Sequence, residues 1–258
     1  MSASKLLIVN ADDFGFTSDV NEGIVEAHRH GILTATTLMA TGAAFEHAVQ
    51  LARENPGLDV GCHLVLTGGV SLLPPRRALP STVPELALAV ALGRVRIYDE
   101  LAEQVQRILG AGIVPTHIDA HKHVHMLPPV MEAMARIAER FRIRWVRRPL
   151  GIPVAGPCLG LLLARRGCRM TDYFTGFRLT GRLDTQALVN LIRRLPEGVT
   201  ELMCHPGYAR AELRTARTRL KASRELELEA LKAHETRQAI QDSGTRLVNY
   251  RSLDAAAR

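Results

Sequence analysis

The sequence predicts an α/β fold, a single-domain distorted TIM-like (β/α) barrel with parallel strands. Apolar segments of strand length alternate with segments of helical periodicity, giving roughly seven or eight βα units. Several of the strand segments end in polar side chains. An open, doubly wound sheet is the alternative, although no GxGxxG or P-loop motif accompanies it. With 258 residues, 47% of them hydrophobic, the chain can build one large core, so we expect a single domain over 1–258.

The order of the elements follows from the periodicity of the apolar residues. Continuous or alternating apolar residues predict strands, and apolar residues every three to four positions predict helices. We expect strands at 5–10, 35–40, 59–66, 114–120, 143–146, 199–204 and 246–250, with a strand or an active-site loop at 172–177. We expect helices from Asp19 up to Gly31, at 45–54, 99–109, 128–140, 157–166 and 184–194, and one long charged helix at 223–242. That charged helix packs either on the barrel or on a second subunit, which makes a homodimer one candidate assembly.

The segment 67–98 is expected to be a lid or a binding loop. It begins with Thr67-Gly68-Gly69 and contains four prolines. Prolines interrupt regular structure, and long irregular connections inside a compact domain are commonly lids or binding loops.

The composition excludes several classes of protein. No segment approaches the roughly 20 apolar residues of a membrane span. The N-terminus lacks the apolar core of a signal peptide. The four cysteines form no CxxC pair, which excludes a zinc knuckle or a redox motif of that kind. Reduced thiols in a cytoplasmic protein are therefore expected.

Paired arginines supply much of the net charge of +7. Such pairs can bind nucleic acid or anionic lipid, and a solvated surface is the simpler interpretation. Aromatic residues make up only 4% of the chain, too few for a surface that stacks on bases. We therefore expect no nucleic-acid partner. The pairs are Arg76-Arg77, Arg147-Arg148, Arg165-Arg166 and Arg193-Arg194.

Two adjacent carboxylates, Asp12 and Asp13, end the first apolar segment. Adjacent buried acids repel each other, so the pair needs a cation, a shared proton or water beside it. Three further strand segments end in histidine, at His63, His121 and His205. The carboxyl ends of parallel strands share one face of an α/β fold, and active sites lie on that face. The sequence therefore predicts that these five side chains meet, although His205 alone, followed by Pro-Gly, predicts an exposed turn.

A histidine-rich run ends the fourth predicted strand. Period-two spacing places His117, Asp119 and His121 on one face of that strand, and His123 and His125 follow in the loop. A polar strand edge with hydrogen-bonded histidines is the structural alternative. The density of histidines beside an aspartate favours a ligand cluster instead.

The histidine at the strand end, His121, is the expected metal ligand of this run, and Asp119 could orient a histidine through a hydrogen bond. Two imidazoles and one carboxylate leave metal positions open for water and substrate, as in catalytic sites. A metal held in this way can polarise a carbonyl and lower the pKa of bound water to about 7. A second carboxylate beside the ligand could accept the proton of that water, which gives a reason for the Asp12-Asp13 pair.

At these motifs the chain resembles the YdjC-like family of carbohydrate deacetylases, which includes chitooligosaccharide deacetylases. Within that family it is most similar to the branch associated with hopanoid biosynthesis, called HpnK. The resemblance covers nearly the whole chain. It is carried by the segments 7–15 (LIVNADDFG), 31–37 (GILTATT), 61–64 (GCHL), 116–126 (THIDAHKHVHM), 204–207 (CHPG) and 250–251 (YR).

The resemblance implies a distorted (β/α) barrel, one divalent metal ion and a role for each motif. Asp13, His63 and His121 correspond to the metal ligands. Asp12 corresponds to the general base, and His205 is the candidate acid that protonates the departing amine.

Further residues are assigned less specifically by the resemblance. Arg147 or Arg148 would hold the base or the substrate, and the motif does not say which. Lys122 stands where relatives often have another histidine, so this position is not expected to be an obligatory ligand. The other candidates for substrate binding or for orienting a ligand are Asp119, His123 and His125.

The implied reaction is the metal-dependent hydrolysis of an N-acetyl group on an amino sugar, which releases acetate. The metal could be Mg²⁺ or Zn²⁺, because imidazole suits zinc whereas a carboxylate with open water positions also permits magnesium or manganese. The substrate partner is an N-acetylated amino sugar, and the hopanoid branch suggests a lipid-linked one. In that case the paired arginines and the apolar run 159–164 would contact the inner face of the membrane from the cytoplasmic side.

Two alternatives belong to other functional classes. A phosphoesterase built on an HxH motif is another metal-dependent hydrolase, but such sites usually need two metals and more ligands. A basic nucleic-acid-binding protein is motivated only by the net charge, and the chain lacks the corresponding motifs.

Overall fold

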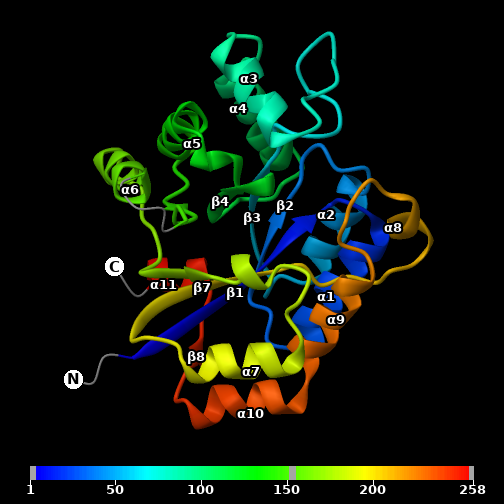
Figure 1. Cartoon of the computed structure of the whole chain (residues 1–258), viewed down its shortest axis with the longest axis vertical. Coiled ribbons are helices and arrows are strands. Elements are labelled where there is room, and N and C mark those ends of the chain that lie inside the picture. The colour runs from blue at the N-terminus through cyan, green and yellow to red at the C-terminus, as the bar shows by residue number, and fades with distance from the viewer. Residues whose placement is uncertain (1–3, 151–154, 256–258) are drawn as a thin grey trace.

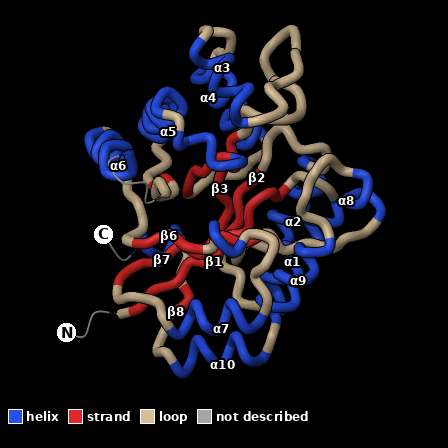
Figure 2. Tube along the Cα trace, in the orientation of Figure 1, coloured by secondary structure: helices blue, strands red, loops and turns tan. Residues whose placement is uncertain are grey.

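The computed structural model describes residues 4–150 and 155–255, in which eight parallel strands form one sheet surrounded by helices (Figure 1, Figure 2). The strands are β1 (Lys5–Phe14), β2 (Ala35–Leu38), β3 (Asp59–Leu64), β4 (His117–Ala120), β5 (Trp145–Val146), β6 (Tyr173–Thr175), β7 (Gly198–Cys204) and β8 (Arg246–Leu247). The helices are α1 (Ser18–His30), α2 (Phe45–Glu54), α3 (Val83–Ala91), α4 (Ile97–Gly110), α5 (Pro128–Phe141), α6 (Ala155–Arg165), α7 (Thr185–Arg193), α8 (Ala211–Thr215), α9 (Ala222–Lys232), α10 (His234–Asp242) and α11 (Tyr250–Ala255). Two 3₁₀ helices, η1 (His121–Met126) and η2 (Phe177–Leu179), complete the elements.

The central strand β1 carries the Asp12-Asp13 pair. The paired strands run in the order β5-β4-β3-β2-β1-β7-β6, and β8 pairs with the N-terminal part of β1. Arg169, just before β6, forms an isolated parallel bridge with Trp145 of β5, which draws the two ends of the sheet together. The sheet is thus curled like a barrel without a continuous ladder between its ends in the part of the chain described. The prediction of a distorted parallel (β/α) barrel is confirmed.

The segment 67–98 is less irregular than its prolines suggested, because it contains α3. Pro84 lies in the first turn of that helix, where its missing N–H costs nothing. The hydroxyl of Thr82 accepts from the amide of Glu85, and the Glu85 carboxylate accepts from the amide of Ser81 at 2.8 Å. These two contacts cap the helix start. Pro84, expected from the sequence to interrupt regular structure, therefore lies in the first turn of a helix.

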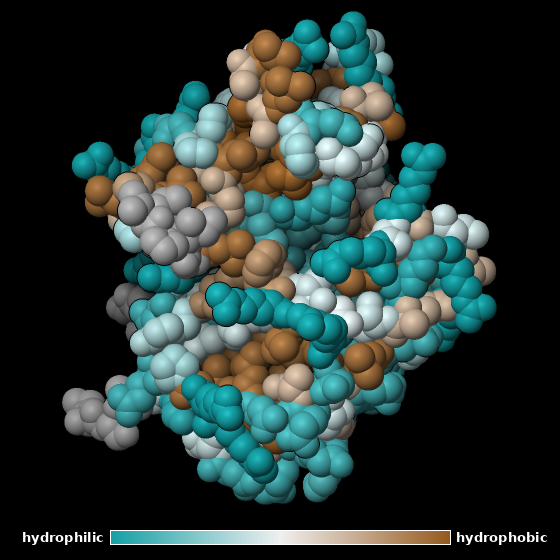
Figure 3. All heavy atoms as spheres, in the orientation of Figure 1, coloured by the Kyte–Doolittle hydropathy of each residue, from teal (hydrophilic) through white to brown (hydrophobic). Residues whose placement is uncertain are grey.

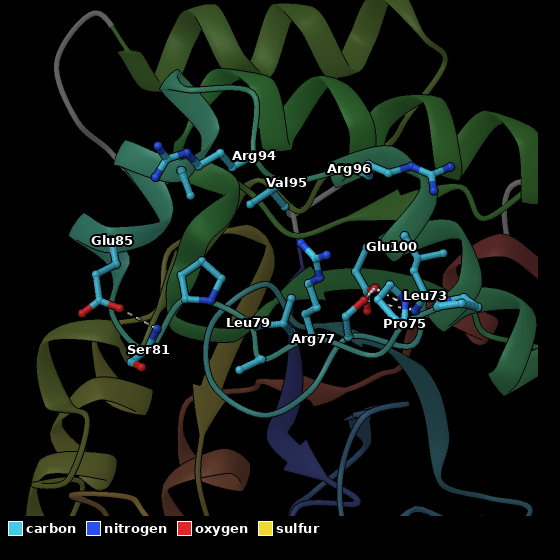
Figure 4. A pocket seen from close by; sticks show the side chains of 15 residues that line it. Leu73, Pro75, Arg77, Leu79, Ser81, Glu85, Arg94, Val95, Arg96 and Glu100 are labelled. Atoms are coloured by element: carbon cyan, nitrogen blue, oxygen red, sulfur yellow. Dashed lines mark hydrogen bonds between the residues drawn. The ribbon is translucent and has the colours of Figure 1, made fainter.

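This segment projects from the sheet, with α3 at the top of the view in Figure 1. A cavity of about 510 Å³ lies within it, between the loop at 71–81 and residues 85–100 (Figure 4). Arg77, Arg94 and Arg96 line that cavity. None of the predicted site residues lines this cavity, and it shares Ala78, Leu79 and Ser81 with the larger cavity at the strand ends.

Several other boundaries differ from the sequence prediction. The charged stretch at 223–242 is two helices, α9 and α10, because Ala233 between them has extended backbone angles. Both pack on this chain, α9 on α1 and α7 and α10 on α7, rather than standing free for a second subunit. The last strand is only β8, since Tyr250 begins α11. β1 continues through Phe14, so both aspartates belong to the strand.

The chain after β7 lies against α1. A Cβ atom on Gly23 would come within 2.4 Å of the Cα of Gly207, so the helix and this loop touch through their backbones. The Asp19 carboxylate also accepts from the amide of Leu213 at 3.0 Å. These contacts hold the loop that carries His205 beside β1.

Among the helices of the described ranges, none is long and apolar enough to span a membrane.

Candidate active site

The two aspartates and three histidines at the strand ends lie around one cavity of about 1430 Å³. Strand register brings them together. His63 of β3 is paired with Asp119 of β4, and Ala11 of β1 is paired with Cys204 of β7. Asp12 and His205 are the next residues after the Ala11–Cys204 pair, so they lie on adjacent strands at the same level. The five predicted side chains thus meet at the carboxyl end of the sheet.

Asp13 faces two histidines with one oxygen. Its Oδ1 lies 3.3 Å from Nε2 of His63 and 3.1 Å from Nδ1 of His121. Its backbone has φ +72°, a left-handed conformation that residues other than glycine rarely adopt. Burial raises the pKa of the Asp13 carboxyl, but Arg224 and the two histidines outweigh it and hold the pKa well below its usual value.

His63 is oriented from behind by Asp119. Its Nδ1 donates to Oδ1 of Asp119 at 2.7 Å, and Thr37 donates to the other oxygen of Asp119 at 3.0 Å. Burial would lower the pKa of His63, but the Asp119 carboxylate outweighs it and raises the pKa to about 10. The imidazole therefore has a strong affinity for a cation or a proton on its free nitrogen.

The donor atoms of Asp13, His63 and His121 fit a divalent metal ion. The three atoms lie within 4.8 Å of one another. Donors about 2.0–2.1 Å from a tetrahedral metal would be about 3.3–3.4 Å apart, close to the separations found here. Nδ1 of His63 carries the proton given to Asp119, so Nε2 is the nitrogen that faces Oδ1 of Asp13 and is left to bind a proton or a cation. A divalent cation in place of that proton would be shared by the donor atoms, so the three residues could hold a metal ion.

A second group of possible ligands, Asp12, His63 and Asp119, overlaps the first. It shares His63, and both of its carboxylates are paired with Arg147. A guanidinium therefore already satisfies these oxygens. The described residues around the cavity offer one metal position and not the two that a phosphoesterase of the HxH type usually needs.

Asp12 is held by a buried arginine. Nη1 and Nη2 of Arg147 donate to its two oxygens at 2.8 and 2.7 Å. Nε of Arg147 donates to Glu201 at 2.7 Å. Burial raises the pKa of Asp12, but Arg147 outweighs it and holds the pKa well below its usual value. Arg148 is exposed and donates to the carbonyl of Thr171, so Arg147 is the arginine that faces the site.

His205 follows β7, which lies on the other side of β1 from β3 and β4. Its Nε2 is 4.0 Å from Oδ2 of Asp12. Its amide donates to Glu227 of α9 at 2.6 Å. Only 8% of His205 is exposed, so the expectation of an exposed turn was wrong. The packing of the loop on α1 and α9 buries a segment that the Pro-Gly sequence alone places at the surface.

The remaining histidines of the run lie apart from the three donor atoms. His117 stacks on Tyr250 with ring centroids 4.0 Å apart, and its Nε2 lies 2.8 Å from Asn10. His123 packs edge-on against Phe177 at 4.9 Å between centroids and lines the cavity. His125 is buried, and burial together with Arg147 lowers its pKa to about 3.

Sequence reasoning missed two buried charges on α9, Arg224 and Glu227. Arg224 contacts Asp13 and Glu227 contacts His205. A signal for them was present, because both interrupt the apolar face formed by Leu220, Leu228 and Leu231 at helical spacing. Charged residues on the buried face of a helix need partners, and here the partners are site residues.

The chain matches known proteins over nearly its whole length. The family model described as YdjC-like protein matches residues 6–242. A protein from Brevibacillus brevis called carbohydrate deacetylase is 38% identical over 96% of this chain and 99% of its own. One of the same name from Clostridium beijerinckii is 33% identical over 96% and 99% of the two chains.

Solved structures share the fold. A protein from Enterococcus faecalis, proposed to be a cellobiose-phosphate cleavage protein, has a TM-score of 0.83 and 27% identity, covering 97% of this chain and 99% of its own. A lactam utilization protein from Thermus thermophilus has a TM-score of 0.55 at 14% identity, covering 93% and 98%, and shows likeness of fold alone. Because the family model and the two relatives span almost the whole chain, the protein belongs to the YdjC-like family.

Proposed function

We propose that this protein is a metal-dependent hydrolase that removes the N-acetyl group from an amino sugar and releases acetate. The observation that carries the proposal is the convergence of Asp13, His63 and His121 beside Asp12 in the lining of one large cavity. Relatives called carbohydrate deacetylases support the choice of an acetylated sugar as substrate. Water adds to the acetamide carbonyl, the C–N bond breaks, and the products are acetate and the free amine.

The catalytic roles follow from the positions of the side chains. A divalent metal held by Asp13, His63 and His121 would polarise the acetamide carbonyl and lower the pKa of a nearby water. Asp12 stays ionised because of Arg147, and its adjacency to Asp13 puts it in reach of that water as proton acceptor. His205, across Asp12, would deliver a proton to the departing nitrogen, which otherwise leaves poorly as an amide anion.

His205→Ala is expected to keep the metal and to lower kcat by about 10²- to 10⁴-fold, the range for a lost general acid or base. The metal stays because His205 is not among the three donor residues. Metal content by mass spectrometry and steady-state kinetics check the result together. Loss of metal in this variant would mean that His205 has a different role.

The segment 67–98 is proposed to be the lid of this cavity. Gly68, Gly69, Val70 and Leu79 line the large cavity from the lid side. At about 1430 Å³ the cavity exceeds the roughly 300–1,000 Å³ of sites for drug-sized ligands. A sugar bearing a second, larger group would use that volume, which supports an extended substrate.

We propose further that the substrate is linked to a lipid and that α3 contacts the membrane. The run 159–164 exposes only part of its apolar surface, because Leu159 and Leu163 are buried and Leu162 is half-buried, whereas Leu161 is 54% exposed. On α3 and after it, Leu88 is 61% and Leu92 is 53% exposed. Figure 3 shows this apolar surface at the tip of the molecule, over α3.

Positive charge surrounds that apolar tip. Four exposed arginines of the lid segment lie in the two loops next to α3. Exposed leucines beside arginines are typical of a helix that rests on an anionic bilayer. The arginines are Arg76, Arg77, Arg94 and Arg96.

Mass spectrometry of metal-loaded protein incubated with N-acetylglucosaminyl compounds tests the reaction and the substrate class. Both chitobiose-type and lipid-linked sugars should be offered. Loss of one acetyl group is expected, and faster loss from the lipid-linked sugar supports the finer proposal. Hydrolysis of phosphoesters without deacetylation would contradict the function.

Leu88→Asp is expected to weaken cosedimentation with anionic vesicles about tenfold, since burying one leucine contributes about 1.5–3 kcal/mol. Leu161→Asp on α6 is the matched control and should bind like the unmodified protein. Binding should also fall as salt is added. Binding that is absent, or that salt does not change, would remove the membrane proposal and leave the deacetylase proposal intact.

A further inference from the structure

Arg224 of α9 reaches the oxygen of Asp13 that the histidines do not use. Its Nη2 donates to Oδ2 of Asp13, and 1% of its side chain is exposed. His63 and His121 both face Oδ1 of the same carboxylate. The two oxygens of Asp13 are therefore divided between the ligand cluster and a guanidinium.

From this division we propose that Arg224 is a positioning residue that restricts Asp13 to binding the metal through one oxygen. A carboxylate can bind a metal through one or both oxygens, and the second would occupy a coordination position. Catalytic metal sites need open positions for water and substrate. With Oδ2 of Asp13 bound to Arg224, only Oδ1 is available to the metal. The coordination position that Oδ2 would occupy therefore stays open for water or substrate. This inference rests on the proposed metal-dependent function.

The guanidinium of Arg224 has one further hydrogen bond and close packing beside it, and its Nη1 has no hydrogen-bond partner among the described residues. Nε of Arg224 donates to the carbonyl of Leu220 at 3.3 Å, and the amide of Gly207 donates to the carbonyl of Arg224 at 3.2 Å. A Cβ on Gly207 would come within 3.2 Å of Cδ of Arg224, so the missing side chain leaves room for the arginine. One turn along α9, Glu227 accepts from the amide of His205. The same helix face thus positions both a candidate ligand and the candidate acid.

Arg224 and Asp119 act on the candidate ligands with opposite sign. Asp119 accepts a hydrogen bond from His63, which makes the imidazole a better donor to a cation. Arg224 donates to Asp13, which withdraws electron density and offsets its charge. Removing Asp119 should therefore weaken metal binding, whereas removing Arg224 should not.

The test compares metal affinity with turnover in Arg224→Met. Met keeps the bulk and removes the donors and the charge, so we expect tighter metal binding together with a kcat lowered about 10- to 100-fold. Equilibrium competition with a chelator, using Mg²⁺ and Zn²⁺ separately and no substrate, measures the affinity. Asp119→Asn should instead weaken the metal about 10- to 100-fold. General damage to the site would weaken the metal and lower kcat together, which would overturn the inference.

Two further variants keep the result interpretable. Arg224→Lys retains the charge, so it should hold the metal as tightly as the unmodified protein and recover part of the lost kcat. If Arg224→Met does not fold, weaker metal binding by Arg224→Lys overturns the inference by itself. Arg193→Met, at the exposed end of α7, is the control for losing one positive charge and should change neither quantity. An unmodified protein that binds no metal at Asp13 and His63 would contradict the proposed function itself.

Discussion

His121→Ala is expected to lose the bound metal and to lower deacetylase activity about a thousandfold or more. The loss is large because a catalytic metal supplies several kcal/mol of transition-state stabilisation, and about 1.4 kcal/mol corresponds to a factor of ten. The fold should survive, since the His121 side chain is 21% exposed at the cavity. Metal content after dialysis and activity on an N-acetylated amino sugar measure the two effects.

The matched control for this variant is His123→Ala. His123 lies two residues further along η1 and lines the same cavity, yet it is outside the donor group of Asp13, His63 and His121. It should keep the metal, with an effect on substrate affinity alone if it contacts the sugar. Full metal content in His121→Ala would show that the ligand assignment is wrong.

Asp12→Asn is expected to lower kcat by about 10²- to 10⁴-fold while the metal is retained, because the amide cannot accept the proton of the attacking water. Arg147 should stay in place in this variant. Nη2 of Arg147 also lies 2.8 Å from Asp119, and its Nε donates to Glu201 at 2.7 Å. Metal content, the unfolding temperature and kcat separate the loss of the base from loss of structure.

The outcome that would contradict the role of Asp12 is unchanged kcat in Asp12→Asn with normal metal content. Arg147→Lys offers a second measurement. A single ammonium cannot reproduce the two parallel hydrogen bonds to Asp12, so kcat should fall in this variant too, with the metal still bound. Loss of the metal in Arg147→Lys would mean that the arginine supports the donor group rather than the base.

The comparison of prediction with structure is clearest at the lid. Four prolines and a Gly-Gly pair predicted an irregular segment, yet Pro84 lies in the first turn of α3. The residue type alone does not show whether a proline starts a helix or interrupts one. Here the capping contacts of Thr82 and Glu85 place Pro84 at a helix start. The exposed apolar surface of α3 went unrecognised for the same reason.

The buried turn at His205 shows a second limit. A Pro-Gly sequence after a strand is a local signal for a surface turn. Burial of that turn depends on α1 and α9, which come from distant parts of the chain and contact it through Gly23, Arg224 and Glu227. Local patterns do not contain such contacts.

The sequence by itself determined the parallel (β/α) architecture and the set of side chains gathered at its carboxyl end. Both follow from periodicity, because alternating strands and helices leave few topologies, and parallel strands bring their ends to one face. Only the tertiary structure decided how those side chains divide their contacts. It pairs Arg147 rather than Arg148 with Asp12, and it directs Arg224 to the second oxygen of Asp13. These pairings depend on where the side chains of distant segments point once the chain has folded. The spacing of residues along the sequence does not specify that.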